Sequence, residues 1–273
     1  MLCAYPYMSK QIIEKLYKIE KEEEHYKFLL DSGAFTAFNA GKTITLDEYC
    51  TFLEKLPFTP WKYFTLDVIG DPVATQKNYD IMIKRGFTPA PIFTYGEDLS
   101  IIDEMYKTSD FIGIGGLVGV PSNKMILAVD SALKKVRGRK AHLLGFTRVE
   151  YLKYFKPYSC DSSSWEGGAR FGFTEIYNLK GRMIKIKRKD ILKKPSFEQI
   201  AAFKRYNIDY RKLGKKEEWS GGLSTIRKTS ANGWVELAGH AERKIKTKIF
   251  LAFATNTALD LLYDAYTHQK GNK

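Results

Sequence analysis

Short apolar runs alternate along this chain with longer segments whose apolar residues recur every three or four positions. The short runs are typical of buried β-strands and lie at residues 2–5, 28–31, 63–67, 90–95, 111–116, 142–146, 158–161 and 183–187. Segments with helical spacing separate most of them, at residues 9–24, 46–55, 72–85, 98–107, 122–136 and 148–155. A strand and a helix that repeat about every 25–30 residues predict parallel βα units.

Eight such units predict an α/β fold in the form of a closed (β/α)8 barrel of the TIM type, with a doubly wound open sheet as the main alternative. After residue 187 the pattern changes. Residues 196–206 have helical spacing, and residues 234–267 are expected to form one long helix or two broken ones. The pairs Gly221-Gly222 and Asn232-Gly233 are expected turns. We therefore expect a catalytic barrel over residues 1–190 and a helical, basic extension over residues 191–273 that packs on it.

Two of the expected helices carry explicit start signals. Thr45 precedes one of them and Glu48 follows three positions later, which is the spacing of a capping box. Asp71 precedes Pro72 at the start of another, so Asp71 is expected to cap that helix.

Composition excludes several classes of protein. The chain has 273 residues, of which 44% are hydrophobic, and this is enough for a substantial core. Its best apolar run, residues 249–254, is far shorter than the roughly 18 residues of a membrane span, and its first residues lack the features of a secretory signal. We expect a cytoplasmic protein without membrane contact, as a monomer or a homodimer.

The three cysteines, Cys3, Cys50 and Cys160, are widely scattered and form no CxxC pair. That spacing argues against a structural zinc site, and free thiols fit a reducing compartment. Cys160 lies beside an aspartate, but no histidine partner is signalled nearby, so it is expected to be a buried thiol. The sequence predicts no metal and no other cofactor.

The charge balance points to a polyanionic partner. The chain has 44 Lys and Arg against 31 Asp and Glu, a net charge of +13, and its pI is about 9.4. Nucleic acid is the simplest such partner, whereas the alternative is a generically basic protein. Basic residues concentrate at 180–194, 205–216 and 243–248. Candidate nucleic-acid contacts are Lys185, Lys187 and Arg188.

Acidic residues close three of the predicted strands, where a barrel of this kind carries its chemistry. Asp31 opens the segment DSGAF, Asp67 ends the run YFTLD, and Asp161 lies within YSCDSSSWEGGARFG. Carboxylates at two strand ends meet the requirement of a nucleophile plus acid/base reaction. The alternative is that Asp31 and Asp67 are turn formers or helix caps and that the segment around Asp161 is an ordinary surface loop.

Two other strand regions are less specific. Residues 112–119 (IGIGGLVG) lack the Lys-Ser/Thr pair of a P-loop and the GxGxxG spacing. Their glycines fit a place where the backbone approaches a flat ligand closely. His142 begins a strand, and a histidine there is more often a core residue than a ligand.

Taken in this order, the motifs resemble those of the tRNA-guanine transglycosylase superfamily. The family pattern has a DSGGFQ-like segment, an acidic strand end, a GGL-x-G segment, an HLLG-like strand and a strand end that carries an aspartate nucleophile. Here these positions are residues 31–36, Asp67, residues 115–119, residues 142–145 and Asp161. The resemblance covers residues 28–172.

Departures from the family pattern narrow the resemblance. The chain lacks the CxCxxC…H zinc site of the bacterial tRNA-modifying enzymes, it has no room for the RNA-binding domains of the archaeal enzymes, and Thr36 replaces the glutamine of DSGGFQ. It looks more like the compact phage and bacterial relatives that exchange guanine for a 7-deazaguanine in DNA.

The resemblance implies a glycosyltransferase that exchanges bases in two steps. Asp161 attacks C1′ of a guanine nucleotide in DNA, and N9 of a free 7-deazaguanine base, such as preQ0, then attacks the resulting ester. Asp31 moves a proton on and off the base, and Asp67 binds its N1–H and exocyclic amine. The other pocket residues that it implies are Ser32, Gly33, Phe35, Tyr95, Gly115, Gly116, Leu117, His142, Trp165 and Arg170.

Two alternatives stay open. One is the same exchange on tRNA or another RNA. The other is a non-catalytic DNA-binding barrel whose carboxylates are structural caps.

Overall fold

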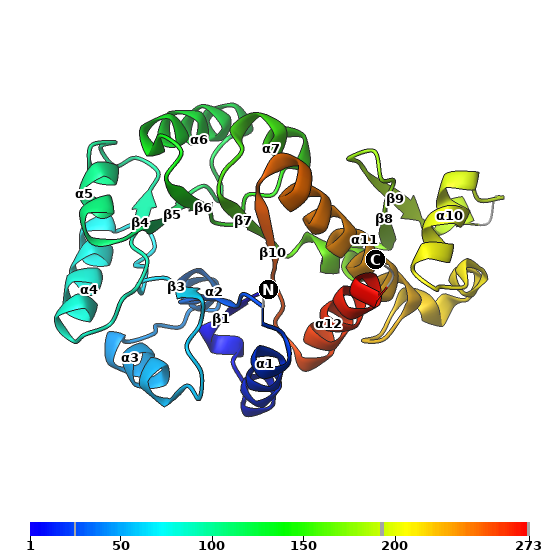
Figure 1. The fold of residues 1–273 in the computed structure, drawn as a ribbon, viewed down its shortest axis with the longest axis horizontal. Coiled ribbons are helices and arrows are strands. Elements are labelled where there is room, and N and C mark those ends of the chain that lie inside the picture. Colours follow the sequence, from blue (N-terminus) through cyan, green and yellow to red (C-terminus); the bar gives the residue numbers. More distant parts are fainter. Residues whose placement is uncertain (25, 192–193, 272–273) are drawn as a thin grey trace. The chain divides into compact units, whose positions relative to one another are not determined.

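The computed structural model describes residues 1–24, 26–191 and 194–271, and the chain divides into two compact units (Figure 1). Unit 1 is Met1–Asp161 and unit 2 is Ser162–Lys273. The boundary that we expected at residue 190 lies inside unit 2.

Unit 1 alternates strands and helices, as the hydrophobic pattern predicts. Its elements are β1 (Leu2–Ala4), a 3-10 turn η1 (Tyr5–Tyr7), α1 (Lys10–Glu22), β2 (Leu29–Asp31), α2 (Ala34–Asn39), α3 (Leu46–Lys55), β3 (Lys62–Tyr63), α4 (Pro72–Lys84), β4 (Ile92–Thr94), α5 (Ile101–Thr108), β5 (Phe111–Gly115), α6 (Ser122–Val136), β6 (Lys140–Leu143), α7 (Val149–Phe155) and β7 (Ser159–Ser162). Helix α2, which directly follows Asp31, is absent from the predicted set.

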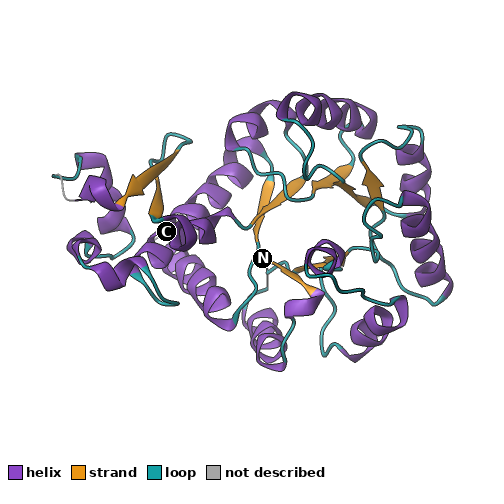
Figure 2. Cartoon of the chain, turned by 180° about the vertical axis from the view of Figure 1, so that it is seen from behind, coloured by secondary structure: helices purple, strands orange, loops and turns teal. Residues whose placement is uncertain are grey.

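The strands of unit 1 are parallel and pair in chain order. β1, β2 and β3 form one sheet, and β4, β5, β6 and β7 lie side by side in another. A parallel bridge between Phe64 and Ala90 joins the segment after β3 to the segment before β4. The helices of unit 1 lie outside its strands (Figure 2). The α/β class with parallel sheets is therefore confirmed.

The two predicted helix starts are present. The Thr45 hydroxyl accepts a hydrogen bond from the Glu48 N–H at 3.2 Å, and the Glu48 carboxylate accepts one from the Thr45 N–H at 2.8 Å. Asp71 accepts from the Ala74 N–H at 2.9 Å at the start of α4. Both arrangements satisfy N–H groups that have no partner inside the helix.

The core of unit 1 centres on β5, whose five residues are all buried. A strand covered on both faces is apolar throughout, which is why no alternation appears in its sequence. Gly113 has a packing reason: a Cβ there would lie 2.9 Å from the ring of Phe64. Glycine at this position leaves room for a buried aromatic ring in the middle of the sheet.

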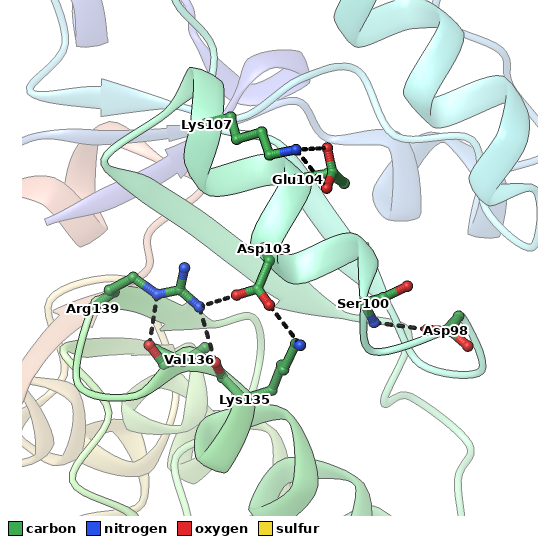
Figure 3. A network of polar contacts seen from close by, with 8 residues as sticks. All are labelled: Asp98, Ser100, Asp103, Glu104, Lys107, Lys135, Val136 and Arg139. Carbon is green, nitrogen blue, oxygen red and sulfur yellow. Dashed lines mark hydrogen bonds and ion pairs between the residues drawn. The ribbon is translucent and has the colours of Figure 1, made fainter.

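Two ion networks tie the outer parts of unit 1 together. Asp103 on α5 lies 2.6 Å from Lys135 on α6 and 2.7 Å from Arg139 (Figure 3). Hydrogen bonds from these two cations lower the pKa of Asp103 to about 2. Asp110, just before β5, contacts Lys62 at 2.6 Å and Lys140 at 2.7 Å. This second network joins the N-terminal ends of three strands, the end that in such folds serves stability.

Unit 2 departs from the predicted pattern. Its elements are η2 (Ser164–Glu166), α8 (Gly167–Phe171), β8 (Phe173–Tyr177), β9 (Met183–Lys187), α9 (Arg188–Ile191), α10 (Phe197–Arg205), η3 (Tyr210–Gly214), η4 (Lys216–Trp219), α11 (Thr225–His240), a π-helical turn η5 (Ala241–Ile245), β10 (Lys248–Leu251) and α12 (Asn256–Gly271).

One expectation about these elements was wrong. Residues 183–187 form a strand, but β9 pairs antiparallel with β8, with Glu175 opposite Lys185, so it is not the eighth strand of a parallel series. Of the two forms expected over residues 234–267, the broken one is present, because η5 and strand β10 separate α11 from α12. A tight turn joins β8 to β9, and there the Asn178 side chain accepts hydrogen bonds from the backbone N–H groups of Lys180 and Arg182.

The pair Asn232-Gly233 lies inside α11 and is not a turn. A Cβ on Gly233 would lie 2.7 Å from the backbone oxygen of Glu175 and 3.2 Å from Cα of Ile176. The glycine therefore lets α11 approach the backbone of β8 closely. An Asn-Gly pair is a frequent turn signal, but here the same residue type serves helix-to-strand packing.

A second apolar core lies entirely within unit 2. Its buried members are Ile176, Ile186, Ala202, Phe203, Tyr206, Leu213, Trp219 and Ile226. It joins the β8–β9 hairpin to α10, η3, η4 and the start of α11. This core gives the basic segments between residues 180 and 216 an ordered support.

The three cysteines, Cys3, Cys50 and Cys160, are free and buried. Burial raises the pKa of the Cys160 thiol, as expected for an inert cysteine. Within residues 1–24, 26–191 and 194–271, no helix combines the length and the apolar character needed to cross a bilayer.

Candidate active site

Three carboxylates lie at or just beyond the C-terminal ends of parallel strands in unit 1. Asp31 is the last residue of β2, Asp161 lies in β7, and Asp67 follows the bridge at Phe64. The negative charges of Asp161 and Asp67 both raise the pKa of Asp31, so the three groups interact electrostatically. The structure thus brings together the three acidic residues that the sequence singled out.

Asp31 occupies an environment that disfavours its charge. Burial raises its pKa to about 6, and the neighbouring carboxylates add to that rise. The Gly33 N–H donates to Oδ2 at 3.0 Å and partly opposes the shift. Gly33 has φ +76°, and a Cβ there would lie 2.1 Å from the Pro6 ring, so only glycine fits this turn. The strand end is therefore built around a carboxyl group that is readily protonated.

Asp161 is held on one oxygen. The Gly145 N–H donates to its Oδ1 at 2.7 Å, and His142 Nε2 lies 3.1 Å from the same atom. The other ring nitrogen of His142 lies 2.9 Å from the Ser159 hydroxyl. With its proton on Nε2, the imidazole donates to Asp161 and accepts from Ser159. The carboxylate has a fixed orientation.

Solvent reaches Asp161 but not its histidine partner. The Asp161 side chain is 14% exposed, whereas the His142 side chain is 0% exposed. Thr147 donates a hydrogen bond to the backbone oxygen of Asp161. His142 is thus a buried residue, as sequence reasoning expected, and it also positions the candidate nucleophile, which sequence reasoning did not foresee.

Asp67 is oriented by the first turn of α4. The Thr75 hydroxyl lies 2.9 Å from Asp67 Oδ1, and the Val68 N–H also donates to the carboxylate. Burial nevertheless raises the pKa of Asp67. The helix is capped by Asp71, so the alternative that Asp67 is the cap of α4 is wrong. Asp67 is a partly buried carboxylate without a capping duty.

A fourth carboxylate, Glu97, belongs to the same neighbourhood. It follows β4, and its Oε2 accepts from the Thr94 N–H at 2.6 Å. Burial raises the pKa of Glu97, and the charge of Asp67 raises it further. Sequence reasoning missed this residue, although the segment Tyr-Gly-Glu after an apolar run carries the same strand-end signal as Asp31.

The glycine-rich end of β5 has a packing explanation. Gly116 has φ +72°, and a Cβ there would lie 2.8 Å from Thr94 Cγ2. A Cβ on Gly115 would lie 3.2 Å from a Leu144 methyl group, and Leu117 is itself buried. These residues keep the ends of β4, β5 and β6 close together. Among the other predicted pocket residues, the aromatic side chains of Phe35 and Tyr95 are 42% and 40% exposed, whereas Ser32 is buried.

Trp165 and Arg170 belong to unit 2. The Trp165 side chain is buried, and its indole N–H donates to the Ala252 backbone oxygen at 2.7 Å. Arg170 lines a surface hollow of about 330 Å³ with Glu166, Ala169, Gly221 and Arg227. Within this hollow Arg227 is paired with Glu166. Another hollow, of about 230 Å³, lies near the starts of β3 and β5 and includes Lys62 and Asp110.

In the described part of the chain, no group of three or more His, Cys, Asp or Glu side chains is arranged to hold a metal ion. Chemically, the site offers one carboxyl group that carries a proton up to about pH 6, next to a carboxylate that is fixed by a backbone N–H. A carboxyl group that is partly protonated near neutral pH is suited to acid/base catalysis, and a carboxylate held in one orientation is suited to nucleophilic attack. No protein-family model matches this chain, and no curated protein matches its sequence.

Proposed function

We propose that the protein is a base-exchange transglycosylase that replaces guanine in DNA with a free 7-deazaguanine base. One observation carries the proposal: Asp31, Asp67 and Asp161 share one neighbourhood at the strand ends of unit 1, and their environments differ. The resemblance of the motifs to the tRNA-guanine transglycosylase superfamily assigns a role to each of them.

Asp161 is the proposed nucleophile. One of its oxygens is occupied by the Gly145 N–H and faces His142, so the carboxylate is held in place while solvent still reaches the residue. In the first step, an oxygen of Asp161 forms a bond to C1′ as the bond from C1′ to N9 of guanine breaks. The product is a glycosyl ester, and the departing base keeps the electron pair of the broken bond.

Asp31 is the proposed acid/base. With a pKa of about 6, a fraction of Asp31 is protonated near neutral pH and can neutralise the departing guanine. The resulting carboxylate then takes the N9 proton of the incoming 7-deazaguanine. N9 attacks C1′, the ester bond to Asp161 breaks, and both carboxyl groups return to their starting states. Two displacements restore the configuration at C1′.

Asp67 and Glu97 are the proposed base-recognition groups. Guanine and 7-deazaguanines present two donors on one edge, N1–H and the exocyclic amine, and one carboxylate can accept both hydrogen bonds. Asp67 has no capping duty in α4, and this supports the assignment. Exposed Phe35 and Tyr95 are candidates to stack on the base.

The finer fold assignment is part of this proposal. The seven parallel strands of unit 1 lie in two sheets that the Phe64–Ala90 bridge joins, with helices outside them, and this arrangement is compatible with a closed (β/α)8 barrel. A site at the C-terminal strand ends is where such barrels place their chemistry. The three free, buried cysteines suit a reducing compartment such as the cytoplasm.

The test is base exchange with labelled substrates. DNA and tRNA that carry labelled guanine are incubated with candidate 7-deazaguanines, and release of the label is measured. We expect release from DNA, together with a covalent protein–DNA adduct on a denaturing gel. Release from tRNA alone would move the substrate to RNA, and binding without any release would support a non-catalytic DNA-binding protein.

The decisive variant is Asp161→Asn, which should lose the adduct and slow label release by orders of magnitude, because an amide is a poor nucleophile. Asp80→Asn is the matched control, since Asp80 is an exposed residue of α4 that contacts Gln76 at 2.9 Å. Full activity in a clean preparation of the Asp161→Asn protein would overturn the assignment.

A further inference from the structure

The net charge of the chain is concentrated in unit 2. Unit 2 has 23 Lys and Arg against 11 Asp and Glu, so it carries +12 of the total of +13, and unit 1 carries only +1. Most of this excess lies in residues 180–216, which contain 14 Lys and Arg but three Asp and Glu. A contiguous third of unit 2 is thus strongly basic.

Two basic segments in that region share one support. On β9 the residues alternate, with Ile186 buried in the second apolar core and Lys185 and Lys187 exposed. On η3, Leu213 is buried in the same core while the Lys and Arg residues around it are exposed. Helix α9, which continues directly from β9, contacts η3. Segments far apart in sequence are therefore held next to each other.

We define the basic face by the exposed cations of these two segments. They are Lys187, Arg188, Lys189, Lys212, Lys215 and Lys216.

One of these six side chains, Lys212, has acidic neighbours close enough to act on, since its charge adds to the hydrogen bonds that lower the pKa values of Asp209 and Glu218. Among the residues that the structure describes, none forms a salt bridge with the six cations of the basic face. Lysines elsewhere behave differently: in α1, Lys10 lies 3.9 Å from Glu14 and Lys18 lies 3.8 Å from Glu22. Like charges gathered on a small surface repel one another and destabilise the fold. An external anion bound to this surface would relieve that repulsion.

The chemistry of the segments favours a phosphate backbone over a membrane. A membrane-surface element needs an exposed apolar face beside its basic residues. Here Ile186 and Leu213, the apolar neighbours of the basic side chains on β9 and η3, are packed into the core of unit 2. The exposed Leu179 and Phe197 lie outside these two segments. Cations spread over a strand end and short helical turns that a common core supports suit a repeating row of phosphates.

We propose that the basic face of unit 2 binds the phosphate backbone of the nucleic acid, and that unit 1 carries the chemistry. The identity of the polyanion rests on the function proposed above. The charge separation itself does not, because it depends only on the sequence and on the second apolar core.

The test uses the full chain and two triple variants that remove the same charge. Lys187→Ala/Arg188→Ala/Lys212→Ala alters the basic face, and Lys10→Ala/Lys15→Ala/Lys18→Ala alters α1 of unit 1. The Kd for a short DNA duplex is measured over a range of salt concentrations. We expect the first variant to flatten the slope of log Kd against log salt by roughly 2–3, because each lost phosphate contact removes about one. The α1 variant should follow the parent.

Equal losses of DNA affinity in the two variants would overturn the proposal. It would also be overturned if anionic vesicles displaced DNA from the parent protein and the basic-face variant no longer bound the vesicles. Melting curves establish that both variants fold. The same titrations in the Asp161→Asn background separate this inference from the proposed function. If the parent exchanges no base but the basic face still governs DNA binding, the function fails and this inference stands. If exchange occurs and the basic face has no effect on binding, the reverse holds.

Discussion

Replacing Asp31 with asparagine should stabilise the protein while it abolishes catalysis. The folded protein raises the pKa of Asp31 from 3.8 to about 6, chiefly by burial. At about pH 4 the folded group is neutral and the unfolded group is only about half ionised, so the cost is small. As the pH rises from about 4 to about 6, Asp31 ionises in the unfolded chain while burial resists its ionisation in the folded protein, so stability falls, and above about pH 6 the loss is complete.

The magnitude follows from the shift. Each pKa unit corresponds to about 1.4 kcal/mol, so a change from 3.8 to about 6 costs about 3 kcal/mol above pH 6. Asparagine resembles the protonated carboxyl group in shape and can still accept the hydrogen bond from the Gly33 N–H. Asp31→Asn should therefore raise the free energy of unfolding by about 3 kcal/mol at about pH 8, and by nearly nothing at about pH 4.

Urea unfolding of the parent and the variant at these two pH values measures the effect. Asp103→Asn is a control of opposite sign, because hydrogen bonds from Lys135 and Arg139 lower the pKa of Asp103 to about 2. Loss of the Asp103 carboxylate should destabilise unit 1 above about pH 4, and the difference in stability between parent and variant should fade as the pH falls towards 2. The Asp103→Asn variant also identifies which unfolding transition reports on unit 1. If Asp31 were only a turn former whose charge is not disfavoured, asparagine would leave the free energy of unfolding unchanged at both pH values, and that result would refute the reasoning.

Three further outcomes are expected. Asp67→Ala should lower kcat/KM for guanine about a hundredfold and reduce its preference over adenine-type bases, with little change in Tm, because an accepting carboxylate is lost. Gly233→Ala should lower the free energy of unfolding in urea by about 1–3 kcal/mol, because the added methyl group would lie 2.7 Å from the Glu175 oxygen. His142→Ala should lower kcat with little change in KM, because the carboxylate of the proposed nucleophile loses a contact at 3.1 Å.

Each of these has a matched control. Asp71→Ala should lower Tm by removing the cap of α4 but leave base selectivity unchanged. If Asp67→Ala also lowered Tm and left selectivity unchanged, Asp67 would not be a base-recognition residue. Gly239→Ala lies in the same helix as Gly233 but meets the flexible Arg243 side chain at 3.0 Å, so a comparable loss there would contradict the packing argument. Ser159→Ala should have a smaller kinetic effect than His142→Ala, since Ser159 acts only through the histidine.

Much of unit 1 could be predicted because its signals are local. Caps such as Thr45 and Asp71 and the spacing of apolar residues depend on near neighbours in the chain. The placement of Asp31 and Asp161 at the C-terminal ends of parallel strands could be predicted from the pattern, but their mutual proximity could not be predicted from pairing alone, because β2 and β7 belong to different sheets.

What could not be predicted depends on partners that are distant in sequence. The direction of β9 is set by its hairpin with β8, and the role of Gly233 by the backbone of Glu175. Nothing in the alternation of Ile and Lys in β9 distinguishes a parallel from an antiparallel neighbour. His142 likewise has an unremarkable sequence context, and its place beside Asp161 arises from the pairing of β6 with β7.

The second apolar core has a consequence for the order of folding in unit 2. All its members fall between residues 176 and 226, and the hydrogen bond from the Tyr177 N–H to the Tyr206 hydroxyl spans 29 residues. The bond from Trp165 to Ala252 spans 87 residues, so its loop closure costs about 1 kcal/mol more. Short-range contacts form fastest, and the hairpin with α10 and η3 should become protected from hydrogen exchange before the Trp165 contact closes. The basic segments would then be in place early, before the indole of Trp165 bonds to the Ala252 backbone oxygen.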